Sequence, residues 1–315
     1  MSAPRPEEIR HAADALRRGE LVVFPTETVY GVGADALRPD AVARIFAAKG
    51  RPADNPLIVH VADEAGARRL TSSWTAQARE LAARFWPGPL TLVVPRAPGV
   101  PDITTGGLDS VAVRVPSHPV AQALLAEARV PVAAPSANRS GRPSPTRVQD
   151  ARADLGDAVA VYLDGGPTQV GLESTVVSLL GARPVILRQG AIPREALGDI
   201  ILGGADPVAR SPGVKYRHYA PRARVVLSNP EGLRAAAPPG LRVAWIASAE
   251  SGLTGPDVRV PGSRRDPEAW ARALFALLRD LDREGYQAIV VEAIPEEGVG
   301  AAVMDRLRKA AEASK

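Results

Sequence analysis

The chain has 315 residues, 45% of them apolar and 23% charged, a composition typical of a globular protein with one large or two ordinary domains. It contains no cysteine, which excludes disulfides, thiolate metal ligands and cysteine nucleophiles, and its four histidines lack the spacing of a zinc site. The net charge of +4 is compatible with nucleotide or RNA ligands, but 35 acidic residues nearly balance the 39 basic ones. The N-terminus lacks an apolar signal sequence and no stretch reaches the roughly 18 apolar residues of a membrane span, so we expect a cytoplasmic protein.

Helix and strand patterns alternate from the N-terminus to about residue 205. Apolar periodicity predicts helices over residues 6–18, 39–49, 74–85, 119–128 and 193–201. Apolar runs predict strands over residues 21–24, 57–60, 90–95, 109–116, 159–163 and 184–188. Two more strands are predicted, one that ends before P-S-A-N (135–138) and one that starts near Ser174. Residues 25–36 and 101–107 are predicted to be loops rich in glycine and threonine. The alternation favours an α/β sheet whose polar strand edges converge on one face.

Two cations flank a glycine directly after the helix predicted at 39–49. Lys49 and Arg51 lie on a loop that Pro52 and Pro56 stiffen, before a short strand that ends in His60. Such a loop suits a phosphate-rich ligand, because lysine offers a point charge and arginine a planar fork that binds two oxygens. The alternative is a solvated basic turn.

Two further polar sites lie next to predicted strands. The P-T-E-T segment around Thr26 presents hydroxyls and backbone N–H groups beyond a strand, or it is a structural turn whose hydroxyls cap the helix at 39–49. Arg114 falls inside the V-A-V-R-V strand, where a buried guanidinium needs an anionic partner. That partner is either a carboxylate of the protein or a carboxylate of a ligand.

The run over residues 131–146 is dense in hydrogen-bond donors and braced by prolines. It carries Ser136, Asn138 and Ser144, and it is either a ligand-binding surface loop or a rigid connector. Downstream, Ser174 begins a strand and Arg188 ends another just before a glycine. These residues repeat the layout in which a strand ends in polar or cationic side chains.

A linker and a second α/β pattern follow. Residues 211–222 place Tyr216, His218 and Tyr219 among cations, and aromatic residues in a linker dock against a neighbouring domain or a bound ligand. Strands are predicted at 225–227, 243–247 and 288–292 and helices at 267–283 and 301–313, with a weak Gly-x-Gly signal before the last helix. We expect a domain over residues 1–205, a linker or lid over 206–222, and a C-terminal α/β domain over 223–315.

The ordered motifs resemble the L-threonylcarbamoyl-AMP synthase family in its longer two-domain form. They are F-P-T-E-T-V-Y-G-V-G, K-G-R-P-A-D-N-P-L-I-V-H, W-P-G-P-L-T, V-A-V-R-V-P, A-P-S-A-N-R-S-G-R-P-S-P-T, G-L-E-S-T-V-V, I-L-R-Q-G and S-P-G-V-K-Y-R-H-Y-A-P, between residues 24 and 221. The C-terminal part matches more loosely, best at G-V-G-A-A-V-M-D-R. The resemblance implies a YrdC-like twisted mixed sheet with a basic concave cavity, plus a smaller Rossmann-like α/β domain.

The resemblance also implies a reaction, in which L-threonine, bicarbonate and ATP give threonylcarbamoyl-AMP and pyrophosphate with Mg²⁺. Such a nucleotidyltransferase supplies tRNA threonylcarbamoyl transferase proteins for threonylcarbamoyladenosine modification of tRNA. The alternative is an RNA-binding module with a basic concave face and no catalysis, and tRNA contact is compatible with either function.

Site residues follow from the same resemblance, and none of them is expected to bind a metal. Lys49 and Arg51 are the expected catalytic cations at the triphosphate. The other residues expected around the nucleotide are Asn55, Thr105, Ser136, Asn138, Ser144, Arg188 and Tyr219. Those expected around L-threonine are Thr26, His60, Arg114 and Ser174. The aromatic linker residues Tyr216 to Tyr219 are expected to close over the cavity as a lid.

Overall fold

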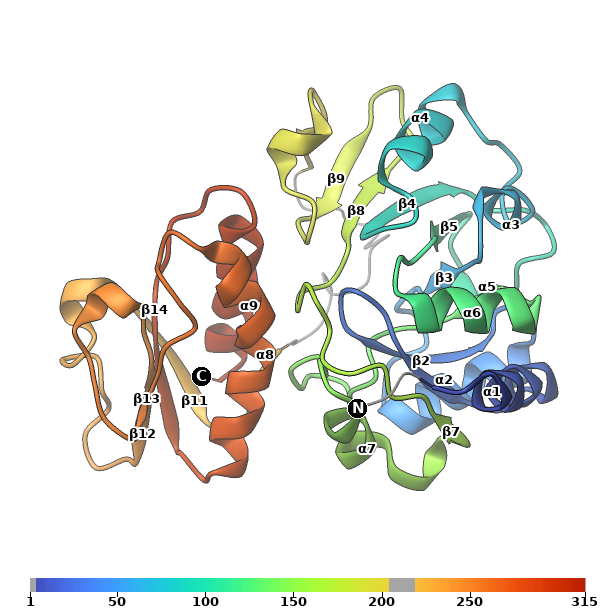
Figure 1. Ribbon diagram of the computed structural model, residues 1–315. Coiled ribbons are helices and arrows are strands. Elements are labelled where there is room, and N and C mark those ends of the chain that lie inside the picture. The colour runs from blue at the N-terminus through green and yellow to red at the C-terminus, as the bar shows by residue number, and fades with distance from the viewer. Residues whose placement is uncertain (1–3, 204–218, 315) are drawn as a thin grey trace.

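The computed structural model describes residues 4–203 and 219–314, which form two β-sheets with helices packed against them (Figure 1). We call residues 4–203 the first unit and residues 219–314 the second unit. The strands of the first unit are β1 (Val22–Pro25), β2 (Tyr30–Asp35), β3 (Ile58–His60), β4 (Leu90–Pro95), β5 (Ser110–Arg114), β6 (Val132–Ala133), β7 (Val161–Tyr162), β8 (Thr175–Ser178), β9 (Val185–Arg188) and β10 (Ile201–Leu202). They form a mixed sheet in the order β10-β9-β8-β4-β5-β3-β6-β2-β1-β7.

Helices cover both faces of this sheet. They are α1 (Pro6–Arg18), α2 (Pro39–Lys49), α3 (Glu64–Arg68), α4 (Ala76–Phe85), α5 (Asp102–Thr105), α6 (Pro119–Ala128) and α7 (Val148–Leu155). Successive strand residues point to opposite faces, so Val22 and Phe24 pack with α1 and α6 while Val23 packs in the larger core with α2 and α4. The strand ends are thereby fixed between two apolar layers.

The register of the sheet brings the polar strand ends together. β3 pairs with β5 in parallel and places His60 beside Arg114. β8 lies between β4 and β9, with Val176 opposite Arg188, and Gly31 bridges to Ser136. The predicted convergence of strand edges on one side of a mixed α/β sheet is confirmed.

The second unit is a four-stranded parallel sheet in the order β11-β14-β12-β13, which confirms the smaller α/β fold. Its strands are β11 (Arg224–Ser228), β12 (Val243–Ile246), β13 (Val258–Arg259) and β14 (Ala288–Glu292). Helices α8 (Pro267–Arg283) and α9 (Gly300–Ala313) pack on one face of it around Trp270 and Phe275. In Figure 1 these two helices lie between the second sheet and the first unit.

Three predicted helices or loops differ from the structure in detail. Residues 193–201 are not an α-helix but a 3-10 helix (Arg194–Leu197) followed by β10, because Gly198 adopts a left-handed φ of 70° and the chain then pairs with β9. Residues 101–107 contain the short helix α5. The predicted loop at 25–36 is a loop only at its start, since Tyr30–Asp35 forms β2.

Glycine explains why β2 resembled a loop in the sequence. A Cβ atom on Gly33 would lie 2.5 Å from Val132 Cγ1 and 2.8 Å from Phe24 Cε1, so the residue must be small for its neighbouring strands to pack. The alternative prediction that the Thr26 hydroxyls cap α2 is also wrong, because the N-cap residue of that helix is Arg38 and has no side-chain cap. Most of the predicted linker or lid, including Tyr216 and His218, lies outside the described residues.

Candidate active site

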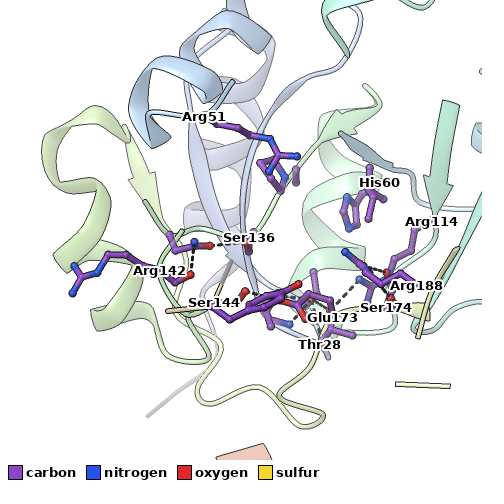
Figure 2. A pocket seen from close by; sticks show the side chains of 18 residues that line it. Thr28, Arg51, His60, Arg114, Ser136, Arg142, Ser144, Glu173, Ser174 and Arg188 are labelled. Carbon is purple, nitrogen blue, oxygen red and sulfur yellow. Dashed lines mark hydrogen bonds between the residues drawn. The ribbon is translucent and has the colours of Figure 1, made fainter. Parts of the chain in front are cut away.

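A small cavity of about 60 Å³ lies where the polar strand ends meet the loops after β1 and β6, and most of its polar lining residues are buried (Figure 2). It brings together most of the site residues predicted from the sequence, namely Thr26, Arg51, His60, Arg114, Ser136, Asn138, Ser144, Ser174, Arg188 and Tyr219. Lys49, Asn55 and Thr105 lie outside its lining. The lining also contains Thr28, Arg142 and Glu173, which the sequence analysis did not assign to the site.

The lining is cationic. Among the residues that the structure describes there, four are arginines (Arg51, Arg114, Arg142 and Arg188) and one is a glutamate, Glu173. Arg51, Arg114 and Arg188 are all buried. Buried positive charge in a small cavity favours an anionic ligand, since the field is poorly screened there.

Arg114 has a carboxylate of the protein as its partner, which is one of the two alternatives left by the sequence. Its Nη2 lies 2.7 Å from Glu27 Oε1, and both side chains are buried. Its Nε donates to the Gly88 carbonyl (3.2 Å) and its Nη1 donates to Thr28 Oγ1 (3.0 Å). A guanidinium has five N–H groups, so these contacts leave N–H groups that can also bind a ligand.

His60 faces the same cavity as a neutral imidazole. Burial, and then the positive charge of Arg114, lower its pKa to about 3. Its Nδ1 is buried and has no hydrogen-bond partner among residues 4–203 and 219–314. A buried polar atom without a partner at a cavity wall is an atom that a ligand can satisfy.

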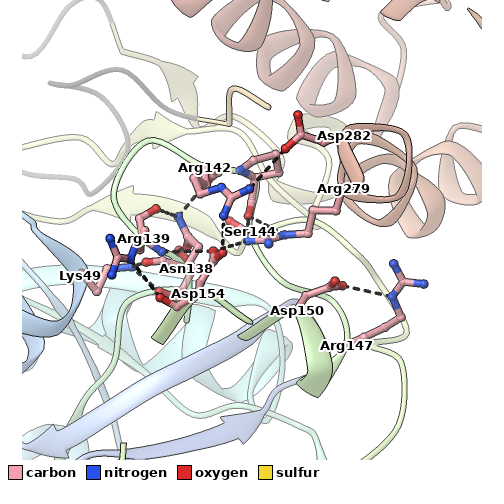
Figure 3. A network of polar contacts seen from close by, with 12 residues as sticks. Lys49, Asn138, Arg139, Arg142, Ser144, Arg147, Asp150, Asp154, Arg279 and Asp282 are labelled. Atoms are coloured by element: carbon pink, nitrogen blue, oxygen red, sulfur yellow. Dashed lines mark hydrogen bonds and ion pairs between the residues drawn. The ribbon is translucent and has the colours of Figure 1, made fainter. Parts of the chain in front are cut away.

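Lys49 lies beneath the 131–146 loop rather than in the cavity wall (Figure 3). Its buried ammonium donates to the carbonyls of Ser136 and Asn138, each at 2.5 Å. Burial, and then the nearby charge of Arg51, lower the pKa of Lys49 well below its ordinary value. Lys49 therefore fixes the backbone of the loop that carries Ser136 and Asn138.

The 131–146 loop is also held by its own side chains. Ser136 Oγ donates to Asn138 Oδ1 (2.5 Å), and Asn138 Nδ2 donates to the carbonyls of Arg139 (2.7 Å) and Arg142 (2.9 Å). Ser144 Oγ donates to Glu173 Oε1 at 2.6 Å across the cavity. A loop with its polar groups paired in this way is preorganised rather than flexible.

Ser174 and Arg188 form the opposite wall. Arg188 donates to the Ser174 carbonyl from Nε (3.2 Å) and to Ser174 Oγ from Nη2 (3.1 Å). Ser174 Oγ also lies 2.7 Å from Thr91 Oγ1. Thr26 closes the cavity from the loop after β1, and its hydroxyl donates to the Val29 carbonyl at 2.6 Å.

The remaining predicted residues have mixed environments. Arg51 Nη2 donates to the backbone carbonyls of Asn55 (3.4 Å) and Pro56 (3.2 Å), so Asn55 belongs to the loop that orients Arg51. Thr105 Oγ1 donates to carbonyls within its own turn, including that of Leu108 at 3.0 Å. Tyr219 lines the cavity from the second unit and stacks on Phe275 with 5.4 Å between ring centroids.

Metal-binding clusters and membrane-spanning helices were sought in the described residues. No group of three or more His, Cys, Asp or Glu side chains is arranged there to hold a metal ion. None of the described helices is both long and apolar enough to cross a membrane.

The fold of the first unit is that of the YrdC-like α/β proteins. A solved structure of E. coli YciO superposes with a TM-score of 0.54 over 59% of this chain and 91% of that one, at 24% identity, which concerns the fold alone. Residues 14–190 match the family described as "Telomere recombination", and residues 188–312 match "Threonylcarbamoyl-AMP synthase, C-terminal domain".

Full-length relatives extend the match to both units. The chain is 45% identical to the threonylcarbamoyl-AMP synthase of Pyrococcus abyssi, over 96% of this chain and 94% of the relative. A crystal structure of P. abyssi Sua5 complexed with L-threonine superposes with a TM-score of 0.92 at 43% identity, covering 99% and 96% of the two chains. A putative threonylcarbamoyl-AMP synthase of Mycobacterium tuberculosis is 45% identical over 62% of this chain and 90% of the relative. The chain belongs to the threonylcarbamoyl-AMP synthase family, as its motifs predicted.

Proposed function

We propose that this protein is a threonylcarbamoyl-AMP synthase, which converts L-threonine, bicarbonate and ATP into threonylcarbamoyl-AMP and pyrophosphate. The observation that carries the proposal is the 45% identity to the P. abyssi synthase over 96% of the chain. The superposition on a relative complexed with L-threonine supports the same assignment. In class the enzyme is a nucleotidyltransferase, because an adenylyl group passes from ATP to a carbamate oxygen.

The reaction requires two anions to meet. The threonine amine attacks the carbon of bicarbonate and a C–O bond breaks with loss of water, which gives a carbamate. One carbamate oxygen then attacks the α-phosphorus of ATP while the bond to pyrophosphate breaks. A protein accelerates this step by positioning the reactants and offsetting their charge, without a covalent nucleophile. Arg51 and Lys49 are the cations we assign to the triphosphate, with Lys49 acting from below the 131–146 loop. The absence of cysteine from the sequence is compatible with this chemistry.

L-Threonine is assigned to the wall formed by β3, β5 and the loop after β1. Arg114 binds the amino acid carboxylate through N–H groups beyond those that contact Glu27, Thr28 and Gly88. Neutral His60 offers its unpartnered Nδ1 to a polar group of the amino acid. Thr26 and Ser174 complete this part of the site.

ATP is assigned to the wall formed by the loop after β6 and by β9. The residues proposed to contact the nucleotide or to shape its site are Asn55, Ser136, Asn138, Ser144, Arg188 and Tyr219. Thr105 is the weakest member of this set, because its hydroxyl already donates within its own turn.

Mg²⁺ is proposed to enter with ATP as part of the substrate. The carboxylate among the described lining residues, Glu173, is engaged by Ser144 and Arg306, which does not fit a metal held by the protein. Mg²⁺ in nucleotide enzymes is bound largely by phosphates and water. The enzyme would act in the cytoplasm and pass its adenylate to tRNA threonylcarbamoyl transferase proteins.

The test is pyrophosphate release by the purified protein with ATP, Mg²⁺, bicarbonate and L-threonine. We expect release that stops when threonine or bicarbonate is omitted. Equal release with and without threonine would overturn the proposal. The RNA-binding alternative is less well supported, because Arg51, Arg114 and Arg188 are buried in a cavity rather than spread over an open face.

A further inference from the structure

One wall of the cavity is held by an arginine from the second unit. Arg306 of α9 has a fully buried side chain (0% exposed), and its Nε donates to Glu173 Oε2 at 3.0 Å. Its Nη2 donates to the Gln189 carbonyl (2.9 Å), next to Arg188. Its guanidinium carbon lies 5.4 Å from the centroid of the Tyr219 ring. Glu173, Arg188 and Tyr219 all line the cavity.

Three consecutive residues, Gly171, Leu172 and Glu173, contact the second unit. Leu172 is fully buried in the same core as Trp270 and Phe275. Gly171 has a φ of 82°, and a Cβ atom there would lie 2.2 Å from the Ala271 carbonyl oxygen of α8. Only glycine permits so close an approach of the two backbones. The position of Glu173 in the cavity therefore depends on α8 and α9.

Arg306 also determines the charge of Glu173. Burial raises the pKa of this carboxyl group, but the charges of Arg306 and then Arg188 outweigh burial and hold the pKa below its usual range. The groups that face Glu173 are Arg306 from α9, Arg188 from β9, the Ser144 hydroxyl and the Tyr219 phenol. Glu173 is consequently an ionised hydrogen-bond acceptor at neutral pH.

An ionised Glu173 fixes the direction of the Ser144 hydroxyl. A serine hydroxyl has one proton, and Ser144 gives it to Glu173 Oε1 at 2.6 Å. Toward the cavity the Ser144 oxygen can then only accept a hydrogen bond. It suits a donor group of a substrate, such as a sugar hydroxyl or an amino group.

We infer that Arg306 is a positioning residue of the active site, supplied by the second unit, which holds the Glu173 carboxylate and thereby fixes the direction of the Ser144 hydroxyl. This inference rests on the proposed function, because the substrate donor belongs to ATP or L-threonine. The second unit thus contributes to substrate selection through Arg306 of α9.

The matched variants are R306M, R306K and R283M. Arg283 of α8 also pairs across the units, with Asp150 at 2.5 Å, and within the described part of the chain its ion pairs are to Asp150 and Asp280, neither of which lines the cavity. Asp150 keeps a second partner, Arg147 at 3.1 Å, when Arg283 is lost. R283M therefore removes a cross-unit ion pair without touching Glu173.

In a pyrophosphate-release assay, R306M should lower kcat/KM by about tenfold or more, as is typical when a buried orienting partner is lost. Without Arg306 the pKa of Glu173 rises, so the acidic limb of the pH profile should move to higher pH. R306K should recover part of the activity, since an ammonium keeps the charge but cannot contact both Glu173 and the Gln189 carbonyl. R283M should stay within about twofold of wild type and keep the wild-type pH profile.

A double variant tests whether Arg306 acts through Glu173. E173Q/R306M should lose no more activity than the more impaired of the two single variants, because the same contact is removed. Fully additive losses, or an R306M profile identical to that of R283M, would overturn the inference. Amide hydrogen exchange of residues 171–174 gives a readout without catalysis: R306M should exchange faster there and R283M should not. If wild type lacks threonine-dependent activity, the proposed function fails, and unchanged exchange in R306M still rejects the role of Arg306.

Discussion

The two sheets of this protein use their strand ends in opposite ways. In the first unit, strands end in side chains that line the cavity, as His60, Arg114 and Arg188 do. In the second unit, β14 ends in Glu292, which accepts hydrogen bonds from Ser248 and pairs with Arg264 at 3.0 Å, all within that unit. Among the described residues, the second unit lines the cavity with Tyr219, while α8 and α9 contact residues that line or flank it, such as Pro143 and Glu173. A domain can therefore shape a site that lies at the strand ends of its neighbour.

Helix α8 also contacts the 131–146 loop, through Arg279 and Asp282 (Figure 3). Arg279 of α8 donates from Nε to the Pro143 carbonyl at 3.0 Å and pairs with Asp154 at 2.7 Å. Arg142 joins Asp154 (2.8 Å) to Asp282 of α8 (3.3 Å). The 131–146 loop is thus held by Lys49 from within the first unit and by Arg279 from the second.

The largest effect is expected within the first unit, at Arg114. R114M leaves Glu27 as a buried charge without its ion-pair partner and should lower the free energy of unfolding by about 3–5 kcal/mol. Urea denaturation measures this loss. E27Q/R114M should recover most of the stability but not threonine-dependent activity. Recovery of both would show that Arg114 has only a structural role.

Lys49 should show a large effect on activity. K49M removes the donor to the Ser136 and Asn138 carbonyls, and with it a cation proposed to act at the triphosphate. We expect pyrophosphate release to fall about 100-fold, the scale of losing one oriented donor in a transition state. R44M, an exposed arginine on the same helix, is the control and should retain wild-type rates. A K49M enzyme as active as R44M would contradict this role.

The R279M variant tests how much α8 contributes to stability. R279M removes both donors to the Pro143 carbonyl and one of the cations at Asp154, and should cost about 2 kcal/mol of stability. Asp154 keeps Arg142, which limits the loss. Thermal unfolding monitored by circular dichroism provides the measurement. No change in melting temperature would mean that the two units dock without this contact.

His60 should make stability depend on pH. Its pKa is about 3 in the folded protein and about 6.5 in an unfolded chain, so the unfolded chain binds the proton first as pH falls. Wild type should therefore lose about 2 kcal/mol more than H60N between pH 7 and pH 5. Parallel urea titrations of the two proteins at both pH values give this difference, and equal losses would refute it.

The smallest effect is expected two residues beyond Arg306. Arg308 lies on the same helix and pairs with Glu296 at the surface, with a side chain 45% exposed. R308M should change the free energy of unfolding by less than about 0.5 kcal/mol, because solvent screens such pairs. A loss well above that bound would show that α9 is sensitive to charge along its whole length rather than at Arg306.

The sequence was sufficient for the sheet, the family and most of the cavity wall, because those rest on local patterns and ordered motifs. The sequence was insufficient to predict side-chain contacts between residues that lie far apart along the chain. Arg306 and Glu173 are 133 positions apart and Arg114 and Thr28 are 86 apart, and no local pattern encodes such pairs. β2 was missed because its glycines, which suit tight strand packing, are also typical of loops. The position of Lys49 below the 131–146 loop could not be predicted either, because it depends on how that loop folds back over the lysine.

The distribution of counter-ions between the units limits how this enzyme could be shortened. Glu173, Asp150 and Asp154 are buried carboxylates of the first unit, and each has an arginine partner on α8 or α9. The M. tuberculosis relative, 90% of which matches 62% of this chain, indicates that shorter members of the family exist. A minimal enzyme made by deleting residues 219–314 would remove one arginine partner from each carboxylate, which leaves Asp150 with Arg147, Asp154 with Arg142 and Glu173 without its ion pair to Arg306. Its design should therefore supply Glu173 with a new cationic partner from within the first unit, because Glu173→Gln would remove the carboxylate that orients the Ser144 hydroxyl.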